Sequence, residues 1–185
     1  MLQIIVPAAV VEEFDEEHNE FIYTTIEEEQ TLQLEHSLVT LSKWESKWCK
    51  PFLSSKDKTD EELLDYIKIM TITQNVDSNV YNRLSDANVD AINKYIDAPM
   101  TATTFAKDAN AKHSREVITA EIIYYWMIAL NIPFECQYWH LNRLLTLIRV
   151  CNVKNAPPKK MSKRATASQY AQLNAARRKQ FNSRG

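Results

Sequence analysis

The chain has 185 residues, of which 45% are apolar and 25% charged, and its formal net charge is −2. This length and composition are enough for one globular domain with a hydrophobic core. The only glycine is Gly185, and phosphate-binding loops, dinucleotide fingerprints and nucleophile elbows all need glycine at a sharp backbone turn, so the sequence excludes these enzyme sites.

The N-terminal region carries the signature of strands. Residues 31–35 alternate between polar and apolar side chains, and residues 20–25 are rich in aromatic and β-branched types. A turn is expected at Glu17–Glu20, and the many acidic side chains are expected on one solvated face. The predicted strands are Leu2–Val6, Val11–Asp15, Glu20–Thr25 and Thr31–Glu35.

Helical spacing begins at Ser37, where Leu38, Leu41 and Trp44 recur on one side of a helix that ends before Pro51. A second helix is predicted from Thr59, which offers a capping hydroxyl ahead of first-turn carboxylates. A short helix is expected over 77–84, and another starts at Ser85 and ends at Asp97. Residues 100–115 form a connector.

Two apolar helices are predicted between Glu116 and Asn155. Pro133 disfavours helical geometry in the residue before it, so the first helix stops near Asn131 and the second begins near Phe134. In the second helix, one face is apolar and the other polar or cationic. The apolar positions are Leu141, Leu144, Leu145, Ile148 and Cys151, and the opposite face includes Asn142, Arg143, Thr146 and Arg149.

Beyond Asn155 the composition changes. Pro157 and Pro158 stiffen the chain, a basic cluster follows, and residues 165–181 form a helix that is marginal in isolation. The predicted fold is therefore α+β and mainly α-helical, with N-terminal antiparallel β-hairpins or a meander packed on a helical bundle. We expect a globular domain at 1–155, β-rich over 1–36 and helical over 37–155, and a flexible basic tail at 156–185.

The charges are segregated along the chain. Residues 1–35 contain ten acidic residues and no Lys or Arg, whereas residues 136–185 contain eleven Lys or Arg and no acidic residue. Such segregation suits intramolecular attraction, head-to-tail self-association or separate charged partners.

Membrane and disulfide signals are weak. Leu2–Val6 lacks the basic flank of a signal peptide, and Ile122–Leu130 is too short to span a bilayer. The odd set of Cys49, Cys136 and Cys151 indicates free thiols in a reducing cytoplasm rather than a disulfide framework. We therefore expect a soluble protein that does not contact membranes.

Neither a metal site nor a catalytic site is predicted. Cys136 and His140 are spaced i, i+4 on the expected helix and could offer two ligands, but a closed zinc site needs four and no second pair matches. The cysteines and His36, His113 or His140 also lack the sequence context of a nucleophilic site. We expect no cofactor and no enzymatic activity.

The candidate binding residues are aromatic and basic. Large aromatics at helical spacing usually belong to the core, but some can form an interface. The aromatic candidates are Tyr124, Tyr125, Trp126, Tyr138 and Trp139, and the basic ones are Arg143, Lys159, Lys160, Arg177, Arg178 and Lys179. The basic tail is suited to remaining solvated or to docking on a protein. Nucleic acid is disfavoured because the pI is about 6.1 and aromatics are sparse among these charges.

The chain resembles a known family, most clearly over residues 116–181. WHLNRLLTLIRVCNVKNAPPKKM (139–161) and LNAARRKQ (173–180) are similar to tail assembly chaperones, or related tail-module proteins, of long-tailed, siphovirus-type bacteriophages, with weaker similarity over 37–52 and 95–105. The resemblance implies a protein of the host cell cytoplasm that binds the tape-measure protein, and the tail-tube protein as a further partner, during virion morphogenesis.

Two alternatives remain beside this expectation. The first is a structural virion protein of the tail or the head–tail connector, in which the acidic front of one copy meets the basic back of the next. The second, weaker, is a nucleic-acid-associated protein that uses the basic tail.

Overall fold

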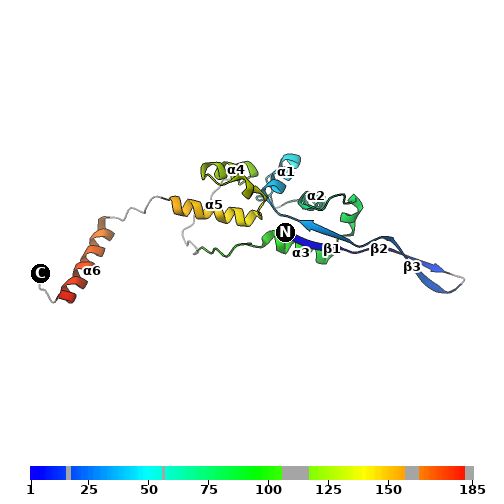
Figure 1. Cartoon of the computed structure of the whole chain (residues 1–185), viewed down its shortest axis with the longest axis horizontal. Coiled ribbons are helices and arrows are strands. Elements are labelled where there is room, and N and C mark those ends of the chain that lie inside the picture. Colours follow the sequence, from blue (N-terminus) through cyan, green and yellow to red (C-terminus); the bar gives the residue numbers. More distant parts are fainter. Residues whose placement is uncertain (16–17, 56, 106–116, 157–162, 182–185) are drawn as a thin grey trace. The chain divides into compact units, whose positions relative to one another are not determined.

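The computed structural model describes residues 1–15, 18–55, 57–105, 117–156 and 163–181, without the side chains of Ile22 and residues 163–166. The fold is α+β and mainly helical, with two small antiparallel sheets near the N-terminus, as predicted. The chain divides into two compact units, Met1–Asn152 and Val153–Gly185. Figure 1 shows the order of the elements along the chain.

The strands form two nested antiparallel pairs. β1 (Leu2–Val6) pairs with β4 (Gln30–Leu34), and between them along the chain β2 (Ala9–Asp15) pairs with β3 (Glu20–Glu27). The four strands lie where the sequence predicts them, and β2 and β3 each extend by two residues. The hairpin arrangement is confirmed; a meander would instead pair each strand with the next.

Among the strand side chains that the structure describes, those that reach the core belong to the β1–β4 pair. Ile4, Val6, Leu32 and Leu34 are buried and alternate with exposed residues, so one face of this pair packs inward while the other meets solvent. The segment after α2 extends this sheet, because the amide of Ile72 donates to the carbonyl of Gln33 at 2.8 Å.

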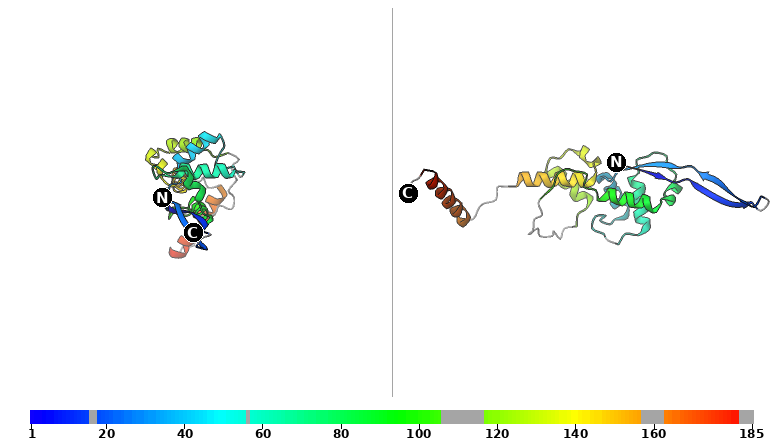
Figure 2. Two further views of the ribbon diagram at one scale, coloured as in Figure 1. Left: turned by 90° about the vertical axis from the view of Figure 1, so that its right-hand side faces the viewer. Right: turned by 90° about the horizontal axis from the view of Figure 1, so that it is seen from below.

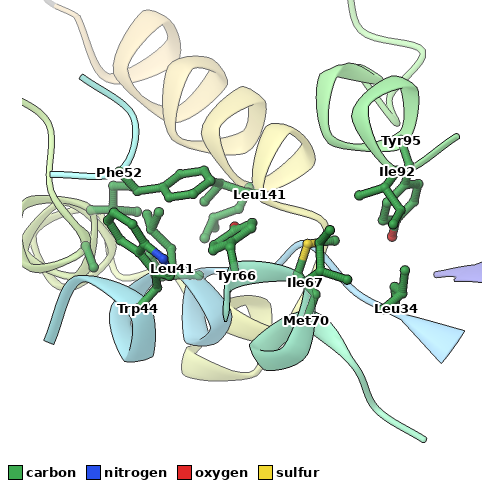
Figure 3. Close-up of a cluster of buried hydrophobic side chains, with 14 of the residues drawn as sticks. Leu34, Leu41, Trp44, Phe52, Tyr66, Ile67, Met70, Ile92, Tyr95 and Leu141 are labelled. Carbon is green, nitrogen blue, oxygen red and sulfur yellow. The ribbon is translucent and has the colours of Figure 1, made fainter. Parts of the chain in front are cut away.

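The first two helices begin at the predicted caps. α1 (Leu38–Trp48) starts at Ser37, whose hydroxyl accepts from the amide of Thr40, and α2 (Asp60–Met70) starts at Thr59 in a capping box. The indole of Trp44 donates to the carbonyl of Glu62 at 2.8 Å and so ties the two helices together. Figure 3 shows Trp44 among the other core side chains of this region.

The middle of the chain also follows the prediction. η1 (Ser78–Arg83) is a 3₁₀ helix, and α3 (Asp86–Asp97) starts at Ser85 with a second capping box. The side-chain amide of Asn88 donates to the carbonyl of Ile5 at 3.0 Å, which fixes α3 against β1. Ile92 and Tyr95 of α3 are buried on the core side (Figure 3).

The predicted pair of long helices needs two corrections. The first, α4, spans Ala120–Ala129, because a carboxylate oxygen of Glu45 accepts from the amide of Ala120 at 2.7 Å and caps the helix there; Glu116 lies outside the described residues. The second is not continuous from Phe134: a 3₁₀ helix, η2 (Phe134–Tyr138), precedes α5 (Leu141–Asn155).

The break between η2 and α5 has a tertiary cause. His140 forms an antiparallel bridge with Ser37, and the amide of Leu141 donates to the carbonyl of His36 at 2.8 Å. This pairing requires an extended backbone at His140. Cys136 lies in η2 and His140 lies between η2 and α5. The prediction that these two residues, four apart in sequence, lie on one helix is therefore wrong.

The second unit contains α6 (Lys163–Phe181). The sequence predicts a helix over 165–181, and the observed one begins two residues earlier. Every described side chain between 167 and 181 is exposed.

The β2–β3 hairpin, with the turn between its strands and residues 28–29, is called the arm (residues 9–29) below. Its apolar side chains, including Val10, Phe14, Phe21 and Ile26, are exposed on a ribbon of only two strands. Figure 1 and the right panel of Figure 2 show the strands of the arm extending from the rest of the N-terminal unit. The expectation that all the hairpins pack on the helices therefore holds for β1–β4 but not for the arm.

Arg83 holds the base of the arm. Its guanidinium donates to the carbonyl of Pro7 at 2.8 Å and pairs with the carboxylate of Glu27 at 2.9 Å, so one side chain spans the junction between the two strand pairs. The side chain is only 16% exposed, which strengthens these charged hydrogen bonds relative to surface ones.

Replacing Arg83 with Ala should loosen the arm. The change removes charged hydrogen bonds worth about 1–3 kcal/mol, and amide exchange in β2 and β3 should accelerate more than exchange in α5. Hydrogen exchange with mass spectrometry measures both regions in one experiment. Arg83→Lys should recover part of the protection, because a lysine can keep the ion pair with Glu27 but cannot also donate to the carbonyl of Pro7 as the guanidinium does. Unchanged amide exchange in the arm of Arg83→Ala would contradict this role.

Candidate partner-binding surface

α4 presents one fully buried side and one exposed side. Ala120, Ile123 and Met127 are buried at helical spacing, and the helix packs against α1. On the opposite side, Tyr125 is 66% and Ile128 61% exposed. Two large apolar side chains three residues apart on a packed helix form what we call the α4 surface (Tyr125 and Ile128).

η2 begins close to Tyr124 of α4. Asn131 takes a left-handed conformation with φ of 52°, which an Asn tolerates, and Pro133 then starts η2 with Phe134 exposed. The ring of Phe134 lies 6.4 Å from the ring of Tyr124. Since Tyr124 precedes Tyr125 on α4, the exposed Phe134 adjoins the helix that carries the α4 surface.

The neighbours of Tyr125 are fixed by the core. Tyr124 and Trp126 are half-buried and pack against the core. The hydroxyl of Tyr124 donates to the side-chain oxygen of Gln137 at 2.9 Å, and burial raises the pKa of Tyr124. Among the three consecutive aromatics predicted to bind, Tyr125 is the one that faces solvent.

Tyr138 and Trp139, the other predicted aromatic residues, also differ in exposure. Tyr138 is 64% exposed, whereas Trp139 is half-buried with the guanidinium of Arg143 4.1 Å from its ring centroid. Such a cation–π contact is worth about 0.5–1 kcal/mol at an exposed site. Tyr138, Trp139 and Arg143 together line a hollow of about 260 Å³, below the roughly 300–1,000 Å³ of typical ligand pockets.

The predicted basic residues fall in other parts of the chain. Arg177, Arg178 and Lys179 are exposed on α6, in the second unit. Lys159 and Lys160 lie outside the described residues. The structure thus brings Tyr138, Trp139 and Arg143 to one hollow, and Tyr124, Tyr125 and Trp126 to one helix.

The sequence prediction missed the exposed aromatics of the arm. Phe14 and Phe21 are directly opposite in the strand register, with ring centroids 5.0 Å apart, and the hydroxyl of Tyr23 donates to Glu12 at 2.9 Å. A signal was present: Glu12 and Glu13 are adjacent and must point to opposite faces of a strand. Neither face of this ribbon is therefore free of charge and suited to burial.

Two buried histidines lie at the centre of the N-terminal unit. The rings of His36 and His140 are 5.2 Å apart, and the Tyr66 hydroxyl lies 2.6 Å from Nδ1 of His36. Nδ1 of His140 accepts from the amide of Asn142, so its Nε2 carries the proton donated to the carbonyl of Tyr95 at 2.9 Å. These contacts connect the end of β4, α2, α3 and the start of α5.

Both histidines are neutral at pH 7. Burial, with a smaller effect of the nearby His140, lowers the pKa of His36 from 6.5 to about 3. Burial likewise lowers the pKa of His140. A neutral, hydrogen-bonded pair of this kind is suited to joining secondary-structure elements.

Among the described residues, no three His, Cys, Asp or Glu side chains are grouped to hold a metal ion. No helix in the described part of the chain has both the length and the apolar character needed to cross a membrane. No protein-family model, curated protein or solved structure matches this chain.

The pKa of His36 predicts a loss of stability in acid. Because the folded-state pKa is about 3 and the ordinary value 6.5, the unfolded chain binds a proton below pH 6.5 that the folded chain excludes. The free energy of unfolding should therefore fall as the pH drops from 7 toward 3, with about 2 kcal/mol lost through this group by pH 5.

Urea unfolding at pH 7 and pH 5 checks this prediction. His36→Gln removes the titrating group and should show a smaller loss between the two pH values than the unchanged protein. Gln137→Ala, which replaces a half-buried side chain that does not titrate, is the control, and its loss between the two pH values should equal that of the unchanged protein. Equal losses for His36→Gln and the unchanged protein would contradict the assignment.

Proposed function

We propose that this protein is an assembly chaperone of long-tailed phage tails, which binds the tape-measure protein and assists the addition of tail-tube subunits around it. Two features support the proposal. The first is the resemblance of residues 139–161 and 173–180 to that family. The second is the α4 surface, where exposed apolar side chains are available to a partner.

The observation that carries the proposal is the exposure of Tyr125 and Ile128 on a helix whose opposite side is fully buried. Their neighbours Ile123 and Met127 hold the helix in place, so the exposed pair is presented with little conformational freedom. Tyrosine is enriched at interface hot spots because it offers a large, rigid contact area. An apolar pair three residues apart suits contact with the apolar face of a partner helix.

The acidic side chains near the α4 surface favour a basic partner. Glu121 is exposed four residues before Tyr125 on α4, and Glu135 is exposed beside Phe134. An apolar surface with an acidic rim favours a helix whose apolar face is flanked by Lys or Arg. A tape-measure protein is long and largely helical, as the family resemblance implies. Before the tube surrounds it, its apolar helix faces need such cover.

Truncating the α4 surface should weaken binding without harming the fold. Tyr125→Ala and Ile128→Ala should each weaken binding of a tape-measure fragment, by about 2 kcal/mol or about 30-fold if they are hot spots. Because both side chains are exposed, stability should change by about 0.5 kcal/mol or less. Calorimetric titration and urea unfolding measure the two quantities.

Two variants make the comparison specific. Leu63→Ala removes an exposed leucine from α2 and should leave both binding and stability unchanged. Ile123→Ala removes a buried side chain from α4 and should lower stability by about 2–5 kcal/mol. Unaltered binding by both Tyr125→Ala and Ile128→Ala would contradict the proposed surface.

Mass spectrometry of purified phage particles separates the chaperone from the structural alternative. A chaperone should be present during assembly and absent from mature particles. A fixed copy number in mature tails, together with no affinity for tape-measure fragments, would replace this proposal with a structural role in the tail or connector.

A further inference from the structure

The arm and α6 carry opposite charges and exposed apolar side chains. Residues 9–29 contain nine acidic residues and no Lys or Arg, whereas residues 156–185 contain eight Lys or Arg and no acidic residue. Both are exposed wherever the structure describes their side chains, apart from a few half-buried positions at the ends of the arm strands. The two segments are therefore complementary in charge, and both expose apolar side chains.

We propose that this protein self-associates head to tail, with the acidic arm of one copy bound to α6 of a second copy. The proposal does not depend on the chaperone function, since it concerns different surfaces.

The arm is suited to docking because little of it is covered. A ribbon of two strands is only marginally stable alone. Phe14 and Phe21 form an aromatic pair on one face, and Tyr23 lies on the same face two residues along β3. These side chains remain exposed in the single chain, and a partner that covers them would remove apolar area from water.

α6 offers a matching side. Tyr170, Leu173, Arg177 and Phe181 are spaced at i, i+3, i+7 and i+11, which places them along one side of the helix. Arg178 flanks that side, and Lys179 lies on the opposite side of the helix. The 19 residues of α6 span about 28 Å, close to the roughly 25 Å of the seven- and eight-residue arm strands. The two elements can therefore lie along each other over most of their lengths.

The charge of the arm favours α6 over a second arm as the element that binds it. Two arms facing each other would bring nine acidic residues against nine, so pairing between arms is opposed by repulsion. A cationic helix with apolar side chains meets both requirements of the arm, and α6 is such a helix.

The connection to α6 favours a second copy over the same chain. Within the N-terminal unit, the part of α5 up to Asn152 and the strands of the arm lie on opposite sides (Figure 1 and the right panel of Figure 2). Seven residues, 156–162, join α5 to α6 and span at most about 25 Å. An arm of another copy has no such restriction. Because the two contacting surfaces differ, the association forms a ring or an open chain of copies.

A charge-swap experiment with full-length chains tests the proposal. The arm variant carries Glu12→Lys, Glu13→Lys and Glu20→Lys, and the helix variant carries Arg177→Glu, Arg178→Glu and Lys179→Glu. In the arm variant three lysines face a basic helix and the charge of the arm falls from −9 to −3. In the helix variant the charge of α6 changes from +5 to −1, so an acidic helix faces an acidic arm. Mixing the two variants restores opposite charges, but only between different molecules.

Sedimentation velocity over a range of concentrations gives the readout. The unchanged protein should associate at low salt and dissociate as salt is added, each variant alone should associate at least tenfold more weakly, and an equimolar mixture should recover association. The variant Glu61→Lys, Asp90→Lys, Asp97→Lys changes the net charge as much as the arm variant, but at exposed positions outside the arm, and should associate like the unchanged protein. Circular dichroism verifies that all the variants are folded.

Three results would overturn the proposal. The unchanged protein could remain monomeric at every concentration at low salt, which would also be the outcome of docking within one chain. The separate arm and helix variants could associate as strongly as the unchanged protein. The mixture could also fail to associate although each variant is folded. None of these results bears on tape-measure binding, so failure here is distinguishable from failure of the chaperone function.

Discussion

The pairing of residues 36–37 with 140–141 is the interaction on which the rest of the N-terminal unit depends. The bridge between Ser37 and His140 and the hydrogen bond from Leu141 to His36 bring together chain segments about a hundred residues apart. The side chains add two links, from His36 to Tyr66 of α2 and from His140 to Tyr95 of α3. One point thus connects the end of the sheet to α1, α2, α3 and α5.

The exposed surfaces follow from this arrangement. η2 and α5 lie on either side of His140. α4 packs on α1 and is capped by Glu45, and these contacts determine which side of α4 is buried. Tyr125 and Ile128 are then left on the opposite side. The arm is excluded from the core for a different reason, because acidic residues occupy both of its faces.

Much of the local structure was predictable because it depends on neighbours in sequence. Ser37, Thr59 and Ser85 each start a helix through a hydroxyl that accepts from an amide three residues ahead, and such patterns can be read directly. The strand positions followed from alternation. The break before α5 could not be predicted, because it arises from the pairing of His140 with a residue far away in sequence.

The exposure of the candidate binding residues was predictable only in part. Residues 122–130 are apolar in almost every position, so periodicity cannot tell which of Tyr124, Tyr125 and Trp126 faces solvent; packing against α1 decides it. Arg143 was expected on an outer face, and its contact with Trp139 depends on side-chain geometry. The exposure of the arm could have been inferred from the adjacent acids Glu12 and Glu13.

We propose that the α4 surface contacts a helical tape-measure protein during tail assembly. Photo-crosslinking in infected cells tests this contact most directly, with a benzophenone amino acid placed at position 125 in one variant and at position 63 in another. The account predicts a covalent adduct with the tape-measure protein from position 125 and none from position 63. Adducts from position 125 only with proteins other than the tape measure, or equal adducts from both positions, would contradict it.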